Sequence, residues 1–224
     1  DLLNESERRF TKKLCDAMIP VMIEAFWEIW LEAKKESQGN NTTRVFQELL
    51  RGVKTWNSSI SLKNTEAIIK NQPLFPNLLA AVFVIHVKIL SAIRTDKKSK
   101  KISIKLPAND VFVQRCYELC AKDLYENPFI ITENNSESDR NDDLYRRFHK
   151  NITIIAMSMM AGMIFMSFGA VIYDLHVQGG NFSQADLHKL ISFEQVKEVT
   201  TFIESIIVTV AQAVLEYLRT FLKG

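Results

Sequence analysis

Apolar residues recur every three or four positions along most of this chain, the spacing that places them on one side of an α-helix. The clearest stripe runs from Phe10 to Ile29 within residues 6–36. Pro20 lies inside that stripe, so we expect the helix to kink or split near Met18. Further helices are predicted over residues 44–53, 62–70, 77–94, 109–125, 184–191 and 193–222. The pattern therefore predicts an all-α fold, a multi-helix bundle.

Aromatic residues crowd one part of the first predicted helix. Phe26, Trp27 and Trp30 follow one another so closely that several sides of the helix are apolar. Such a helix either lies centrally in a core or contacts a partner. Core burial is the favoured interpretation, and partner binding by these three side chains is the alternative.

The predicted helix over residues 77–94 carries the longest apolar run of the first half of the chain, from Leu78 to Ile85. Because this run is apolar on every side, we expect the helix to be the most buried element. His86 interrupts the run, and a lone histidine on an apolar helix is typical of a hydrogen-bonded core or boundary residue.

Residues 94–105 form the most basic stretch, and their second half alternates polar and apolar residues. The alternation predicts a small β element over residues 101–106, which Pro107 ends. A strand there would pair within a hairpin or add to an edge in a neighbouring protein. The cations favour a solvated loop, with binding to a partner or a phosphate-bearing surface as the alternative. The candidate contact residues are Lys97, Lys98, Lys100 and Lys101.

Residues 152–173 contain no charged side chain, and about 20 such residues suffice to cross a bilayer as a helix. The preceding Arg146 and Lys150 would hold the N-terminal end of such a span on the cytoplasmic side. A central helix of a bundle has the same pattern, so a membrane span and a buried helix both remain open. The side chains expected to touch lipid are Ile155, Met159, Met163, Phe165, Met166 and Phe168.

The polar and acidic residues 132–143 predict an exposed loop and mark a boundary. We expect a helical domain over residues 1–131, a polar loop or linker over 132–150, and a C-terminal helical pair over 151–224 that serves as the candidate membrane anchor. The chain begins with Asp1, not Met, so we expect an upstream segment that is missing or removed.

Composition narrows the class of protein but indicates no catalytic or binding site. The chain is 47% hydrophobic and 24% charged, which are ordinary values for a chain with a core. Seven glycines and five prolines are few, as expected for long helices. The net charge of +2 gives no strong overall attraction to nucleic acid, and we expect no specific nucleic-acid partner.

No set of residues forms a recognisable catalytic motif. The sequence has no phosphate-binding glycine loop, no nucleophile elbow and no HExxH metal pair. Cys116 and Cys120 are one helical turn apart, but no second pair follows, so buried reduced cysteines, Cys15 among them, are favoured over a zinc site. We therefore expect no catalytic residue, cofactor or metal, and a protein that is not an enzyme.

Several short stretches occur in one order. They are Phe46–Leu50, Val53–Asn57, Leu78-Leu79 with the apolar helix that follows, Ile102–Pro107 and, most specifically, Phe112–Phe129 with its Cys-Tyr-x-x-Cys-Ala and Tyr-x-Asn-Pro-Phe patterns. Together they resemble an uncharacterised family encoded by nucleocytoplasmic large DNA viruses of the phycodnavirus and mimivirus kind. The resemblance covers residues 5–131.

The resemblance implies a minor capsid or virion-associated protein, assembled in the host cytoplasm, with other capsid or virion proteins and the viral inner membrane as partners, in a homo- or hetero-oligomer. It implies no activity and no catalytic residues. Our leading hypothesis is thus a structural protein of a large DNA virus particle. The alternative is a soluble helical adaptor or regulator that binds a viral or host protein.

Overall fold

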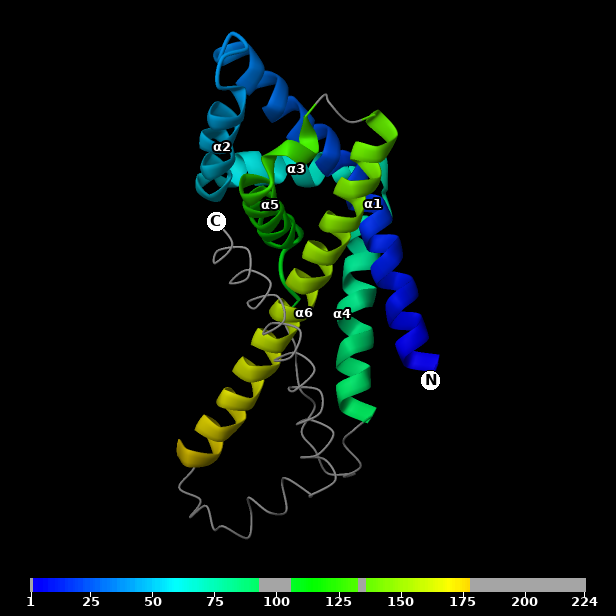
Figure 1. Ribbon diagram of the computed structural model, residues 1–224. Helices are drawn as coiled ribbons and strands as arrows, with labels where there is room; N and C mark the ends of the chain where they lie inside the picture. Colours follow the sequence, from blue (N-terminus) through cyan, green and yellow to red (C-terminus); the bar gives the residue numbers. More distant parts are fainter. Residues whose placement is uncertain (1, 93–105, 133–135, 178–224) are drawn as a thin grey trace, which may run out of the picture. The chain divides into compact units, whose positions relative to one another are not determined.

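The computed structural model describes residues 2–92, 106–132 and 136–177, with side chains over 5–85, 106–132 and 136–162. The described residues form α-helices and two short 3₁₀ turns, with no strand among them, which confirms the all-α prediction (Figure 1). The elements are α1 (Leu2–Glu36), α2 (Thr42–Gly52), η1 (Val53–Thr55), α3 (Ser58–Asn71), α4 (Phe75–Ala92), α5 (Asn109–Glu126), η2 (Pro128–Ile131) and α6 (Glu137–Val177). The predicted β element and the predicted helices over 184–191 and 193–222 lie outside the described residues.

The chain divides into two compact units. The first holds Asp1–Lys88 and Ile102–Ser167, and the second holds Ile89–Lys101 and Phe168–Gly224. Every described side chain belongs to the first unit.

The core of the first unit forms around α1. The Phe26 ring lies 5.5 Å from Tyr117 of α5 and 5.4 Å from Phe148 of α6, between ring centroids. Trp30 meets Phe46 of α2 edge to face at 5.3 Å. Aromatic pairs at such distances add to the apolar area that each ring buries. The four helices α1, α2, α5 and α6 are therefore joined through aromatic side chains of α1.

The described part of α4 is less buried than the sequence suggested. Phe75, Leu79, Val82 and Phe83 are buried, but Val84 is 43% exposed. In contrast, α5 buries seven residues along its length. The expectation that the run from Leu78 to Ile85 is buried on every side is thus wrong, because Val84 faces solvent. The side chains of residues 86–94 lie outside the described residues, and with them the rest of the prediction for this helix.

Pro20 lies inside α1 without splitting it. Its side chain is exposed, while Met18, Ile19 and Met22 around it are fully buried. Of the predicted kink or split near Met18, the split is therefore wrong, because α1 continues through Pro20 as one helix. Buried contacts before and after the proline hold both halves of the helix, which offsets the hydrogen bond that proline removes.

The predicted polar loop over 132–143 is largely helical, because α6 already begins at Glu137. Ser136 caps this helix: its hydroxyl accepts from the Asp139 backbone N–H at 3.2 Å and donates to the Asp139 carboxylate at 2.7 Å. Leu144 and Phe148 then enter the core formed by residues 1–131. The expected linker over 132–150 is thus corrected from residue 137 onward, since this stretch belongs to the first unit.

Candidate protein-binding surface

The three cysteine thiols are the most reactive groups that the sequence offers, and the fold buries all of them. Cys15, Cys116 and Cys120 are fully buried and free. Burial raises the pKa of the Cys15 thiol to about 12, and it raises the pKa values of Cys116 and Cys120 well above the ordinary range. The Asn151 amide donates to the Cys120 sulfur at 3.9 Å. Neutral, buried thiols are poor nucleophiles and poor metal ligands.

Within the described ranges, no group of three or more His, Cys, Asp or Glu side chains is arranged to hold a metal ion. Polar atoms inside the core are instead dispersed. The Tyr117 hydroxyl and the Trp30 indole N–H are buried without a hydrogen-bond partner among the described atoms. Burial also raises the pKa of Tyr117 above its ordinary value of 10.0.

The aromatic residues proposed for partner contact divide between core and surface. Phe26 is fully buried and Trp30 is 6% exposed, so the core interpretation holds for both and their assignment as contact residues is corrected. Trp27 is half-buried, and the Arg140 guanidinium carbon lies 4.0 Å from its ring centroid. This cation–π contact attaches the start of α6 to α1. A helix that is apolar on several sides thus faces α2, α5 and α6 within its own chain.

Lys97, Lys98, Lys100 and Lys101 lie outside the described residues. Among the side chains proposed to touch lipid, Ile155 and Met159 are half-buried and pack against the core. Met163, Phe165, Met166 and Phe168 lie beyond the described side chains.

No single helix in the described part of the chain is both long and apolar enough to cross a membrane. The pair Ser58–Asn71 and Phe75–Ile85, bent by 97° at the break between them, meets the length and composition criteria only jointly.

Phe129 is the most exposed large hydrophobic residue described, with 73% of its surface accessible. It lies in η2 between Pro128 and Ile131, which are both buried. Before it, the Asn127 backbone N–H and side-chain amide both donate to the Asp123 carbonyl, at 3.0 and 3.1 Å. The Phe129 ring is therefore presented to solvent from a turn whose flanking side chains are fixed in the core.

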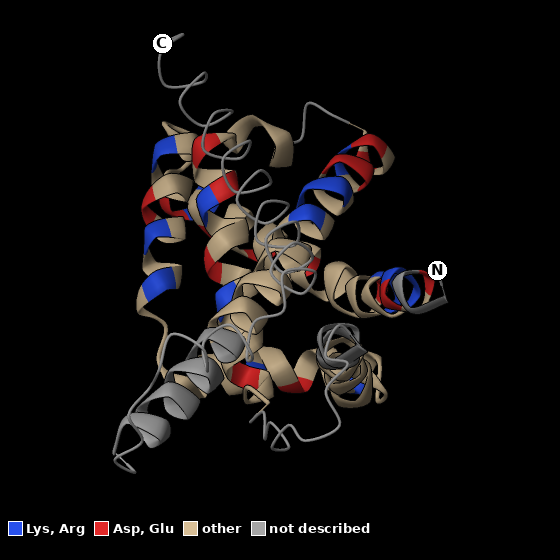
Figure 2. Ribbon diagram, turned by 90° about the horizontal axis from the view of Figure 1, so that it is seen from below, with Lys and Arg blue, Asp and Glu red and all other residues tan. Residues whose placement is uncertain are grey.

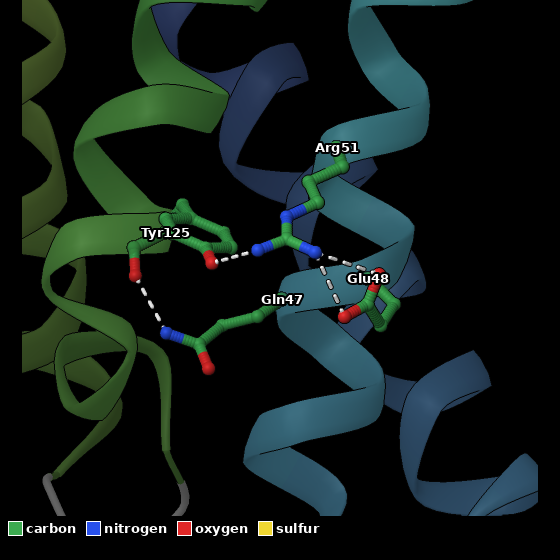
Figure 3. Close-up of polar contacts among 4 residues, drawn as sticks. All are labelled: Gln47, Glu48, Arg51 and Tyr125. Atoms are coloured by element: carbon green, nitrogen blue, oxygen red, sulfur yellow. Dashed lines mark hydrogen bonds and ion pairs between the residues drawn. The ribbon is translucent and has the colours of Figure 1, made fainter.

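The end of α5 is joined to α2 beside this turn (Figure 3). The Gln47 amide donates to the Tyr125 carbonyl at 2.8 Å, and the Arg51 guanidinium donates to the Tyr125 hydroxyl at 2.5 Å. Arg51 also lies over the Tyr125 ring, 5.0 Å from its centroid, and pairs with Glu48 at 3.0 Å. These contacts hold a tyrosine and an arginine on the exposed side of α2 and α5, next to η2.

This surface has the composition of a protein contact. Tyr and Arg are enriched among the residues that contribute most to protein–protein binding, and Phe is enriched at interfaces. Phe129 was not singled out from the sequence, because a Phe after Asn-Pro is equally compatible with a buried or an exposed ring. The only pointer was its place in the Tyr125–Phe129 motif.

Residues 1–132 match the model of a family of unknown function, DUF5764. No curated protein and no solved structure matches the chain.

Proposed function

The chain belongs to the DUF5764 family, and we propose that it is a non-enzymatic structural protein of a large DNA virus particle, a minor capsid component that contacts other capsid proteins. The observation that carries the contact role is Phe129, 73% exposed on a turn whose neighbours Pro128 and Ile131 are buried. Because the backbone of this turn is already held by its hydrogen bonds and by its buried neighbours, a partner that covers the ring need not order the turn, which favours association.

The placement of the thiols also supports a structural role. The three cysteines are buried and neutral at physiological pH. A molecule in solvent therefore meets none of these thiols as a reactive thiolate. Free cysteines are typical of a reducing compartment, which agrees with assembly in a host cytoplasm.

The attribution to a virus particle rests on the resemblance of residues 5–131 to proteins of nucleocytoplasmic large DNA viruses. The family match over residues 1–132 covers the same part of the chain and assigns no function. Contact with the viral inner membrane through residues 152–173 stays part of the proposal.

Mass spectrometry of gradient-purified particles tests this function. We expect the protein to be retained at a constant ratio to the major capsid protein after protease treatment of the particle surface. In parallel, Phe129→Ala should reduce incorporation, whereas Leu74→Ala, at a residue that is 58% exposed on the turn before α4, should not. A protein confined to the cytosolic fraction of infected cells would contradict the proposal and favour the soluble adaptor.

A further inference from the structure

The N-terminal part of α1 exposes a stripe of cations. Arg8, Arg9, Lys12 and Lys13 are all exposed, at spacings that place them on one side of the helix. Glu5 and Asp16 lie on the same side, and the Asp16 carboxylate accepts from the Tyr145 hydroxyl. We call the four cations the basic stripe.

The first turns of α6 expose charge of the opposite sign. Glu137, Asp139 and Asp142 are exposed, and Asp143 pairs with Arg146. The remaining cation there, Arg140, covers the Trp27 ring. Asp139 and Asp142, three residues apart, share one side of the helix, whereas Glu137 lies toward another side. We call these three exposed carboxylates the acidic stripe. In Figure 2, the helix at the marked N-terminus carries both blue and red, as expected for cations interspersed with Glu5 and Asp16.

The two stripes are too far apart to meet within one chain. Arg140 lies on the Trp27 ring, so the start of α6 lies beside the C-terminal half of α1. At 1.5 Å rise per residue, the 14 residues from Lys13 to Trp27 span about 20 Å. Figure 1 agrees, with the start of α6 lying away from the marked N-terminus. Neither stripe is neutralised by the other in the monomer.

We propose that the basic stripe of α1 is a docking surface for a second copy of this chain, which presents its acidic stripe. The charges are complementary, and both stripes lie on the same folded unit. Each copy offers one stripe of each sign, so the basic stripe of one copy can meet the acidic stripe of another, either reciprocally about a two-fold axis or head-to-tail. This inference rests on the proposed structural function, because a structural protein of a particle can use repeated contacts between its copies.

The strength and salt dependence of the contact follow from its chemistry. Exposed ion pairs are weak individually and are screened by salt, over about 10 Å at 0.1 M and about 3 Å at 1 M ionic strength. The association is therefore weak in dilute solution, increases at low salt and disappears at high salt. Phe129 lies on η2 and is in neither stripe, so the two contacts can be perturbed separately.

Charge reversal in the full chain tests the inference, with sedimentation velocity in 50 mM and 1 M NaCl as the measurement. Arg9→Glu with Lys12→Glu reverses part of the basic stripe, and Glu137→Lys with Asp142→Lys reverses part of the acidic stripe. Each variant alone should lose self-association by about tenfold or more at low salt. A mixture of the two variants, and the variant with all four changes, should regain it. Lys63→Glu with Lys70→Glu on the exposed side of α3 is the matched control and should associate like the unmodified chain.

A chain that is monomeric at both salt concentrations overturns the inference, as does association that survives reversal or that is not regained in the mixture. Binding of the basic stripe to anionic vesicles or to duplex DNA without self-association also overturns it, because the occupant is then not a second copy. Detection of the protein in purified particles is a separate readout: a monomeric chain that is nevertheless in the particles sinks this contact but not the structural role.

Discussion

The Arg147 guanidinium and the Asp123 carboxylate form an ion pair of 2.9 Å that joins α6 to α5. Both side chains are partly shielded, at 37% and 22% relative exposure. The second carboxylate oxygen of Asp123 is buried without a hydrogen-bond partner among the described atoms. Arg147 is thus the cation that compensates a partly buried carboxylate, and α6 supplies it from beyond the family-matched residues 1–132.

We expect Arg147→Ala to lower the free energy of unfolding by about 1–3 kcal/mol, because it leaves Asp123 partly buried and unpaired. Urea unfolding followed by circular dichroism measures this. The matched control is Arg146→Ala, which removes a more exposed pair with Asp143, at 77% and 47% exposure, and should cost well under about 1 kcal/mol. Equal losses for the two variants would contradict the role assigned to Arg147.

Two phenylalanines should separate stability from assembly. Phe148 is fully buried against Phe26, so Phe148→Ala should cost about 3–5 kcal/mol of unfolding free energy. Phe129 is 73% exposed, so Phe129→Ala should change stability by less than about 0.5 kcal/mol while reducing incorporation into particles. A Phe129→Ala chain that unfolds as readily as Phe148→Ala would contradict the exposed placement.

The buried thiols should make the free energy of unfolding fall as the pH rises above about 9. An unfolded thiol ionises near 9.0, whereas Cys15 in the folded chain does so near 12. Between these values the unfolded state binds fewer protons than the native state, so stability falls as pH rises. Each such thiol contributes a slope of about 1.4 kcal/mol per pH unit. Unfolding measured between pH 8 and 11 checks this, and Cys15→Ala should flatten the slope.

A thiol-labelling experiment complements the pH series. A thiol-specific reagent such as an aromatic disulfide should modify Cys15, Cys116 and Cys120 only in denaturant, because all three are fully buried. Rapid labelling of the native chain at pH 7.5 would show that the core opens locally, contrary to the packing around Cys120 and Asn151.

The sequence predicted the elements better than the surfaces. The expected helix over 109–125 is α5 (Asn109–Glu126) almost to the residue, because Asn127-Pro128 ends it and its apolar stripe is regular. The start of α6 was missed, because its first turns carry no apolar stripe and are held by the Ser136 cap and by Arg140 on Trp27. Trp27 and Phe129 show the same limit: which aromatic ring finds cover depends on contacts between residues distant in sequence.

The remaining prediction concerns residues 152–173, where lipid contact and core packing were both open. Ile152, Ala156 and Met160 recur every four residues and are nearly fully buried, so the first half of the segment has a side committed to the core of the first unit. An arginine at Met160 places an unpaired charge in that core and should cost about 3–5 kcal/mol of unfolding free energy. Ser158→Arg is the matched control, because Ser158 is exposed and its replacement should cost less than about 0.5 kcal/mol. Equal tolerance of both arginines in urea unfolding would show that this half of the helix leaves the core.

Alkaline carbonate extraction of the unmodified chain from infected-cell membranes tests lipid contact separately: retention in the pellet supports the inner-membrane contact, and full release removes it from the proposed function. If Met159→Arg converts retained protein to released protein, the lipid-facing side includes Met159, where a charge costs a spanning helix about 2.5–3.5 kcal/mol of insertion.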